Sequence, residues 1–207
     1  MAQDLLLRAA QYGDIEEAAL LIQRGLAKPE TVSPPTNTTA LHAACRAQNL
    51  DMVDLLMTAR ACPNAQEITQ CGGRAPLHLA AQANLTEIAT RLLVGGANPV
   101  LRDARGSTPL HAAALEGRAE VTKLLLAHGG DPFMRDFAGF NAAWWAKEFK
   151  HQEVLDVFSA QQVEPLKMSA KERLDFSGVY KQGVAKKKKE NEKSGRGKSP
   201  AVTAKKK

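Results

Sequence analysis

Three histidines recur along the chain at a nearly fixed spacing. His42, His78 and His111 each follow a leucine, and steps of 78 − 42 = 36 and 111 − 78 = 33 residues separate them. A metal site would need these side chains to converge, because nitrogen ligands lie about 2 Å from a zinc ion. One histidine per structural layer would instead leave them about 10 Å apart, the usual distance between packed helices. We therefore expect each imidazole to hydrogen-bond backbone in the neighbouring loop, and we expect no metal.

Three cysteines are the other candidates for reactive side chains. Cys45, Cys62 and Cys71 are odd in number and show no paired C-x-x-C spacing, which indicates free thiols in a reducing compartment. A reactive thiol would need a cationic or helix-end setting that lowers its pKa, and the sequence shows none, so small buried or half-buried side chains are favoured. No Ser-His-Asp arrangement is evident, and Gly-Arg-Gly at 195–197 lacks the strand and helix of a phosphate-binding loop. The sequence thus predicts no enzyme and no cofactor.

The histidines belong to a longer repeated unit, written most clearly from Gly106 to Ala138. Self-similarity at a fixed period is the signature of stacked repeats. In this unit Thr108 can cap a helix, Pro109 suits its first position, and Gly117 suits a left-handed stop. A second helix is expected from about Ala119 to Ala127, with apolar residues at helical spacing.

This unit resembles the ankyrin repeat. The resemblance is carried by Thr108-Pro109-Leu110-His111, Ala113, Ala114, Gly117, Val121, Leu124-Leu125-Leu126 and Gly129-Gly130-Asp131-Pro132. It implies an all-α solenoid of stacked helix-turn-helix repeats with hairpin loops, in which His42, His78 and His111 are structural. We expect about five repeats over residues 1–161, the first and last being degenerate caps. A linker or docking segment at 162–185 and a basic low-complexity tail at 186–207 would follow.

Some positions depart from the repeated pattern. Gln48 stands where glycine is expected, which predicts a tighter or reshaped turn. The connection from Cys62 to Ala75 is three residues longer than the later one, so its hairpin should project. Trp144 and Trp145 are adjacent on a helix and cannot both face the core, so one should be partly exposed.

The resemblance also implies where a partner would bind. In this family, partners usually contact the hairpin tips and the exposed side of the first helices, which together form the concave face. The matching residues singled out here are Arg46, Arg74, Gln82, Arg105, Leu115, Glu116, Phe137, Phe140 and Phe149. The apolar members suggest a contact patch. Phe137 and Phe140 could instead pack beneath the C-terminal cap or the chain's own tail.

Charge is divided unevenly between the repeats and the C-terminus. The net charge of the whole chain is +6, whereas Lys186 to Lys207 hold ten Lys and Arg against two Glu, a net of +8. The remainder therefore carries 6 − 8 = −2. Such a tail could serve as a nuclear-localisation or nucleic-acid segment, could bind an acidic protein surface such as tubulin tails, or could be solvated without a partner. No aromatic residues interleave the lysines, which disfavours specific single-strand binding.

Together these features predict a non-catalytic adaptor or scaffold subunit. The chain would bind a protein through its concave face and an acidic partner through its tail, in a microtubule or flagellar setting for example. The alternative is a nuclear or ribonucleoprotein factor whose tail contacts nucleic acid. No apolar run is long enough to span a membrane. We expect a cytoplasmic protein, cytoskeletal or flagellar or alternatively nuclear, that is monomeric alone or part of a larger assembly.

Overall fold

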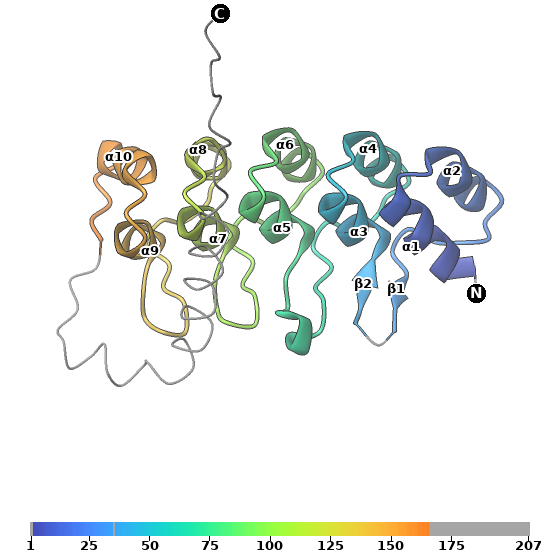
Figure 1. The fold of residues 1–207 in the computed structure, drawn as a ribbon, viewed down its shortest axis with the longest axis horizontal. Helices are drawn as coiled ribbons and strands as arrows, with labels where there is room; N and C mark the ends of the chain where they lie inside the picture. The colour runs from blue at the N-terminus through green and yellow to red at the C-terminus, as the bar shows by residue number, and fades with distance from the viewer. Residues whose placement is uncertain (1, 35, 166–207) are drawn as a thin grey trace, which may run out of the picture. The chain divides into compact units, whose positions relative to one another are not determined.

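The computed structural model describes residues 2–34 and 36–165, which fold as a stack of five helix pairs (Figure 1). The first helix of each pair lies in an inner row and the second in an outer row. The inner helices are α1 (Ala2–Tyr12), α3 (Ala40–Arg46), α5 (Pro76–Gln82), α7 (Pro109–Leu115) and α9 (Ala142–Glu148). The outer helices are α2 (Ile15–Gln23), α4 (Leu50–Thr58), α6 (Thr86–Val94), α8 (Ala119–Ala127) and α10 (Gln152–Ala160). The expected linker beyond Pro165 and the basic tail lie outside the described residues.

Small side chains allow the inner helices to pack closely. Ala44, Ala81, Ala114 and Ala146 are fully buried in successive layers. Large apolar side chains instead fill the space between the rows, where Leu41, Leu77 and Leu110 from the inner helices meet residues of the outer ones. The result is one continuous core that runs through all five layers. Its buried outer-helix members include Met52, Leu56, Leu92, Leu125 and Phe158.

Each helix pair is joined by the same left-handed turn. Gly13, Gln48, Asn84, Gly117 and Lys150 occupy equivalent positions, with φ between 58° and 78°. The expectation that Gln48 reshapes its turn is therefore wrong, since its φ of 58° matches that of Asn84 at 61°. A side chain with a Cβ is disfavoured but not forbidden in this region. Packing of the flanking helices holds the backbone in this conformation despite the cost.

The hairpins extend from the inner row, away from the outer helices (Figure 1). The first contains a short antiparallel pair, β1 (Val32–Ser33) and β2 (Thr38–Thr39), in which Val32 faces Thr39. The second holds a single 3-10 turn, η1 (Thr69–Cys71), at its tip. Residues 67–74 span this hairpin where 103–107 and 136–140 span the later ones, so the expected projection is confirmed.

The last repeat closes the stack with aromatic side chains. Trp144 occupies the position that histidine holds in the preceding repeats and stacks on Phe140 at a centroid distance of 3.7 Å. Trp145 is buried and its indole N–H donates to Asp136 Oδ2 (2.9 Å). Trp144 is half-buried, as the adjacency of the two residues predicted. Packing continues past Gln161, because Val163 is buried and the Asn141 amide donates to the Glu164 carbonyl.

Replacing Leu125 by alanine should lower the free energy of unfolding by about 2–5 kcal/mol, the range for leucine truncation in a packed core. Leu125 is fully buried on α8 and packs between layers. The matched control is Leu20→Ala on α2, which makes the same chemical change at a side chain that is 45% exposed. We expect this control to cost less than about 1 kcal/mol. Urea denaturation of both variants would measure the difference, and equal losses would contradict the register.

Candidate protein-binding face

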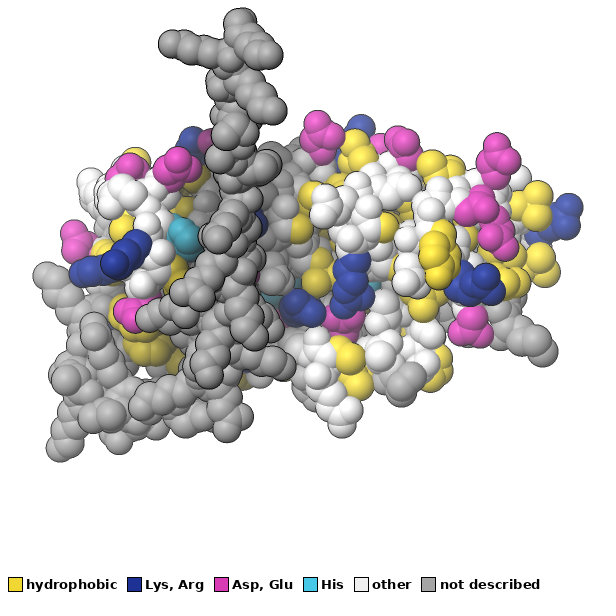
Figure 2. All heavy atoms as spheres, in the orientation of Figure 1, with side chains coloured by type: hydrophobic (Ala, Val, Ile, Leu, Met, Phe, Trp, Pro, Cys, Tyr) yellow, Lys and Arg dark blue, Asp and Glu magenta, His cyan; other side chains and the backbone are white. Residues whose placement is uncertain are grey.

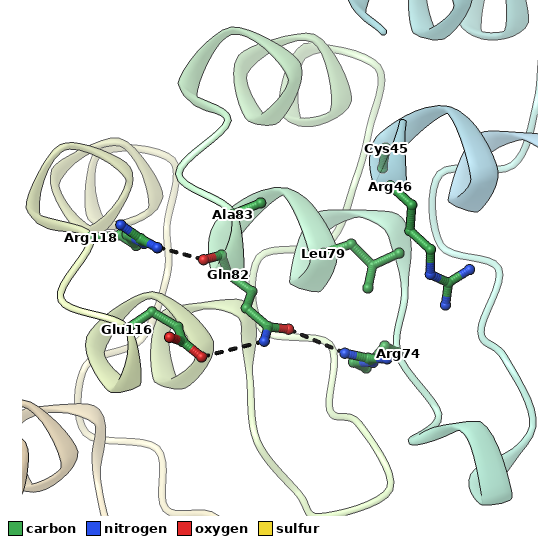
Figure 3. Close-up of a pocket in the computed structure, with 8 residues that line it drawn as sticks. All are labelled: Cys45, Arg46, Arg74, Leu79, Gln82, Ala83, Glu116 and Arg118. Atoms are coloured by element: carbon green, nitrogen blue, oxygen red, sulfur yellow. Dashed lines mark hydrogen bonds between the residues drawn. The ribbon is translucent and has the colours of Figure 1, made fainter. Parts of the chain in front are cut away.

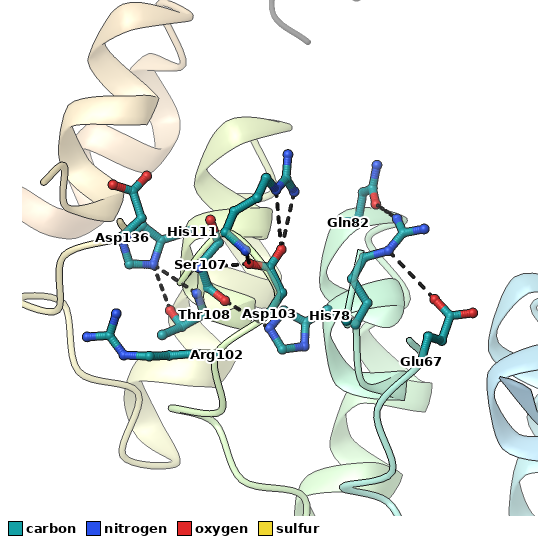
Figure 4. A network of polar contacts seen from close by, with 12 residues as sticks. Glu67, His78, Gln82, Arg102, Asp103, Ser107, Thr108, His111 and Asp136 are labelled. Carbon is teal, nitrogen blue, oxygen red and sulfur yellow. Dashed lines mark hydrogen bonds and ion pairs between the residues drawn. The ribbon is translucent and has the colours of Figure 1, made fainter. Parts of the chain in front are cut away.

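The three recurring histidines connect neighbouring layers. The Nε2 atoms of His42, His78 and His111 lie 3.0–3.2 Å from backbone carbonyls of the next hairpin, which belong to Arg74, Ser107 and Phe140. The expected interlayer hydrogen bonds are thus confirmed. Figure 4 shows His78 near Ser107, and His111 with its contact to Thr108.

The other imidazole nitrogen fixes the direction of these bonds. Nδ1 of His111 accepts the backbone N–H of Thr108 (3.2 Å), and Nδ1 atoms of His42 and His78 accept equivalent bonds from Thr39 and Ala75. A neutral imidazole that accepts at Nδ1 must carry its proton at Nε2. Each histidine therefore donates its Nε2–H to the carbonyl of the following layer. No group of three or more potential metal ligands is present in residues 2–34 and 36–165.

Burial keeps these histidines neutral. Loss of hydration lowers the pKa of all three imidazoles below the usual 6.5, and it lowers that of His78 to about 4. The hydrogen bond to the Ser107 carbonyl favours the charged form but only partly offsets this effect at His78. Burial likewise raises the pKa of the Cys45 thiol to about 12, so this cysteine is an unreactive core side chain.

A second row of contacts joins the layers at the turns between helices. The Arg118 Nε–H donates to the Gln82 carbonyl (3.2 Å), and His151 Nε2 lies 3.1 Å from the Leu115 carbonyl. The His151 ring lies so close to Gly117 that a Cβ there would approach it to 2.5 Å. Glycine at residue 117 therefore leaves space for this ring and also suits the local φ of 73°.

The hairpins contain buried acids at the repeat spacing. Glu67, Asp103 and Asp136 each donate their backbone N–H to the same carbonyl that the histidine of the preceding layer contacts. The carboxylates of Asp103 and Asp136 also accept backbone N–H groups within their own short hairpins. In the longer hairpin the acid is Glu67, and its carboxylate pairs with arginine side chains instead.

Glu67 pairs with two arginines. Its side chain is almost fully buried, and Oε1 accepts a hydrogen bond from Arg46 and another from Thr38 (3.3 Å). Its Oε2 lies 3.9 Å from Arg74 Nε, which is an ion pair but too long for a hydrogen bond. Glu67 therefore orients both guanidinium groups from beneath.

Arg74 is also held from the side by Gln82. The Arg74 guanidinium donates to Gln82 Oε1 (3.1 Å), and Gln82 Nε2 donates to Glu116 Oε1 (3.3 Å). Figure 3 shows this chain of contacts, together with the Arg118 bond to the Gln82 backbone. Gln82 thus links Arg74 of its own layer to Glu116 of the next.

These residues border a surface cavity of about 380 Å³. We call it the arginine groove, and its lining residues are Cys45, Arg46, Arg74, Leu79, Gln82, Ala83, Glu116 and Arg118. Figure 2 shows Lys and Arg side chains near the middle of the viewed face, below the level of the outer helices. The groove has charged side chains at its rim and the buried side chains of Cys45 and Leu79 at its floor.

The structure brings together four of the nine partner-binding residues expected from the sequence. Arg46, Arg74, Gln82 and Glu116 all line the arginine groove. Arg105 is exposed and pairs instead with Asp103 (3.3 Å). Glu67 and Arg118 were not anticipated, although Glu67 lies 36 residues before Asp103 and this recurrence was a usable signal.

The expected apolar patch is only partly present. Phe137 is 66% exposed, and Leu115 and Phe149 are half-buried. Of the two alternatives for Phe140, packing in the C-terminal cap is confirmed and exposure is wrong, because its ring is 6% exposed and lies against Trp144 and Trp145. These tryptophans are features of the last repeat alone, which explains why the position could not be judged from the repeated unit.

The fold and this face define a class of protein. A family model of ankyrin repeats matches residues 6–103 and 77–167, in three copies. The chain therefore belongs to the ankyrin repeat family, whose repeats generally mediate protein–protein interaction. A comparison with curated proteins gives no match. None of the helices in the described part of the chain is long and apolar enough to cross a membrane.

Acidification should destabilise the protein between pH 6.5 and about pH 4. The unfolded chain binds protons at its histidines below pH 6.5, whereas folded His78 resists protonation until about pH 4, so unfolding is favoured as the pH falls. Each such imidazole contributes a slope of at most about 1.4 kcal/mol per pH unit. Urea denaturation at several pH values would measure this slope.

The variant His78→Gln should flatten that slope, even though it lowers stability at pH 7. The matched control, His128→Gln, makes the same substitution at an exposed residue at the end of α8, and His78→Gln should flatten the slope more than this control does. An unchanged slope in His78→Gln would show that the interlayer histidine is not responsible.

Proposed function

We propose that this chain is a non-catalytic adaptor or scaffold subunit that binds a protein through the face formed by its hairpins and inner helices. The observation that carries the proposal is a row of accessible side chains at one repeat position. Arg46, Gln82, Leu115 and Glu148 are the last residues of four successive inner helices, and each is exposed or half-buried. Such a row presents a surface that crosses several layers, as an extended partner requires.

The charge division supports a separate role for the tail. We propose that Lys186 to Lys207, with a net charge of +8, contact an acidic partner, while the repeats provide specificity. Exposed lysines act as screened charges, so this contribution should depend steeply on ionic strength. Acidic protein surfaces such as tubulin tails fit this chemistry, and a cytoplasmic or cytoskeletal location follows from it. Retention on nucleic acid at physiological salt would favour the nuclear alternative instead.

Site-specific photo-crosslinking should locate the partner-binding face. A benzophenone amino acid placed at Ala83, which is exposed beside the arginine groove, should crosslink a protein in cell extract. The same substitution at Val94, which is 77% exposed at the end of outer helix α6, is the matched control and should not. Equal crosslinking from both positions, or none from Ala83, would contradict the proposed face.

Removing Lys186 to Lys207 should lower the salt dependence of partner retention. Both chains would be bound to the crosslinked partner once it is purified, and affinity would be measured at low and high sodium chloride. The melting temperature should stay within about 2 °C, because this lysine-rich stretch offers few apolar side chains for a core. An unaltered salt dependence would show that the lysines do not contact the partner.

A further inference from the structure

We infer that the arginine groove binds an extended acidic peptide segment, with carboxylates at its rim and an apolar side chain at its floor. This inference rests on the proposed function and specifies the partner's chemistry. Arg46 and Arg118 lie at opposite ends of the groove, and Leu79 lies between them (Figure 3).

The guanidinium groups have unused hydrogen-bonding capacity. Each has five N–H donors, and one nitrogen of each of Arg46, Arg74 and Arg118 donates a hydrogen bond within the described residues. No carboxylate of the described chain lies within ion-pair distance of Arg118. A ligand carboxylate could therefore bind the free edge of this guanidinium in a bidentate manner.

The arginines are held in place before any ligand arrives. Glu67 fixes Arg46 and Arg74 from below, and Gln82 fixes Arg74 through its side chain and Arg118 through its backbone. Side chains that are already ordered lose less conformational entropy on binding. This arrangement distinguishes the groove from a set of unconnected surface arginines.

The lining favours a peptide over other polyanions. None of the eight lining residues is aromatic, so the groove offers no platform for stacking nucleobases. Its floor is apolar, which suits an aliphatic side chain. Its three arginines against one glutamate favour an acidic ligand over a basic one.

Fluorescence anisotropy with a labelled Glu-Glu-Leu-Glu-Glu peptide would test the assignment on the full chain. Arg118→Gln should weaken binding by about fivefold or more. Glu116→Gln should strengthen it by about twofold, because it removes a repelling charge yet keeps an acceptor for Gln82. Such opposite effects from neighbouring positions would not follow from a merely structural role.

The matched control is Arg91→Gln, which removes one arginine from outer helix α6, where it pairs with Asp54. This variant should stay within about twofold of the parent. Every variant retains the tail, so differences among them report the groove alone. Melting temperatures within about 2 °C of the parent would establish that each variant is folded.

Equal affinities for Arg118→Gln and Arg91→Gln would overturn the inference, as would weaker binding by Glu116→Gln. A labelled thymidine oligonucleotide that loses as much affinity in Arg118→Gln would also overturn the peptide assignment. None of these results bears on crosslinking at Ala83, so the face could bind a partner of different chemistry. Conversely, loss of the Ala83 crosslink would contradict the proposed face whatever the peptide does.

Discussion

The hydrogen bond from a buried imidazole to the backbone of the next layer is the interaction on which this architecture depends. A hairpin cannot pack on its own, and its carbonyl groups must be satisfied when they are buried. Arg74, Ser107 and Phe140 each supply one carbonyl that accepts both a histidine and the backbone N–H of a hairpin acid. Each of these three hairpins is thus positioned by the layer before it, and so are the surface side chains that it carries.

The arginine groove lies where the hairpins differ. The short hairpins use Asp103 and Asp136 to satisfy their own backbone, and these carboxylates largely serve folding. In the second hairpin three additional residues and a longer side chain direct Glu67 toward Arg46 and Arg74 instead. The acid at this repeat position therefore stabilises the hairpin turn in two layers, whereas in a third layer it pairs with the arginines at the rim of the arginine groove. A recurring framework keeps its register while single positions acquire new contacts.

Recurrence made most of the framework predictable from the sequence. The helix of Ala119–Ala127, the interlayer bonds of His42, His78 and His111, and the projecting hairpin all follow from comparing equivalent positions. The misjudged positions lack such equivalents. Gln48 adopts a conformation that its residue type disfavours because the flanking helices impose it. Phe140 is covered by tryptophans unique to the last layer, and Arg118 faces the groove only because it bonds to another layer's turn.

The two rows of contacts between layers have a mechanical consequence. His42, His78 and His111 connect the second to fifth layers at the hairpins, while Arg118 and His151 connect the third to fifth layers at the turns between helices. Each of these bonds reaches only its immediate neighbour, so a pull along the stack loads them in series. The contacts at the weakest boundary then break first, and about one repeat of chain is extended while the remaining layers stay packed. A solenoid built in this way lengthens under tension in discrete steps, one layer boundary opening at a time.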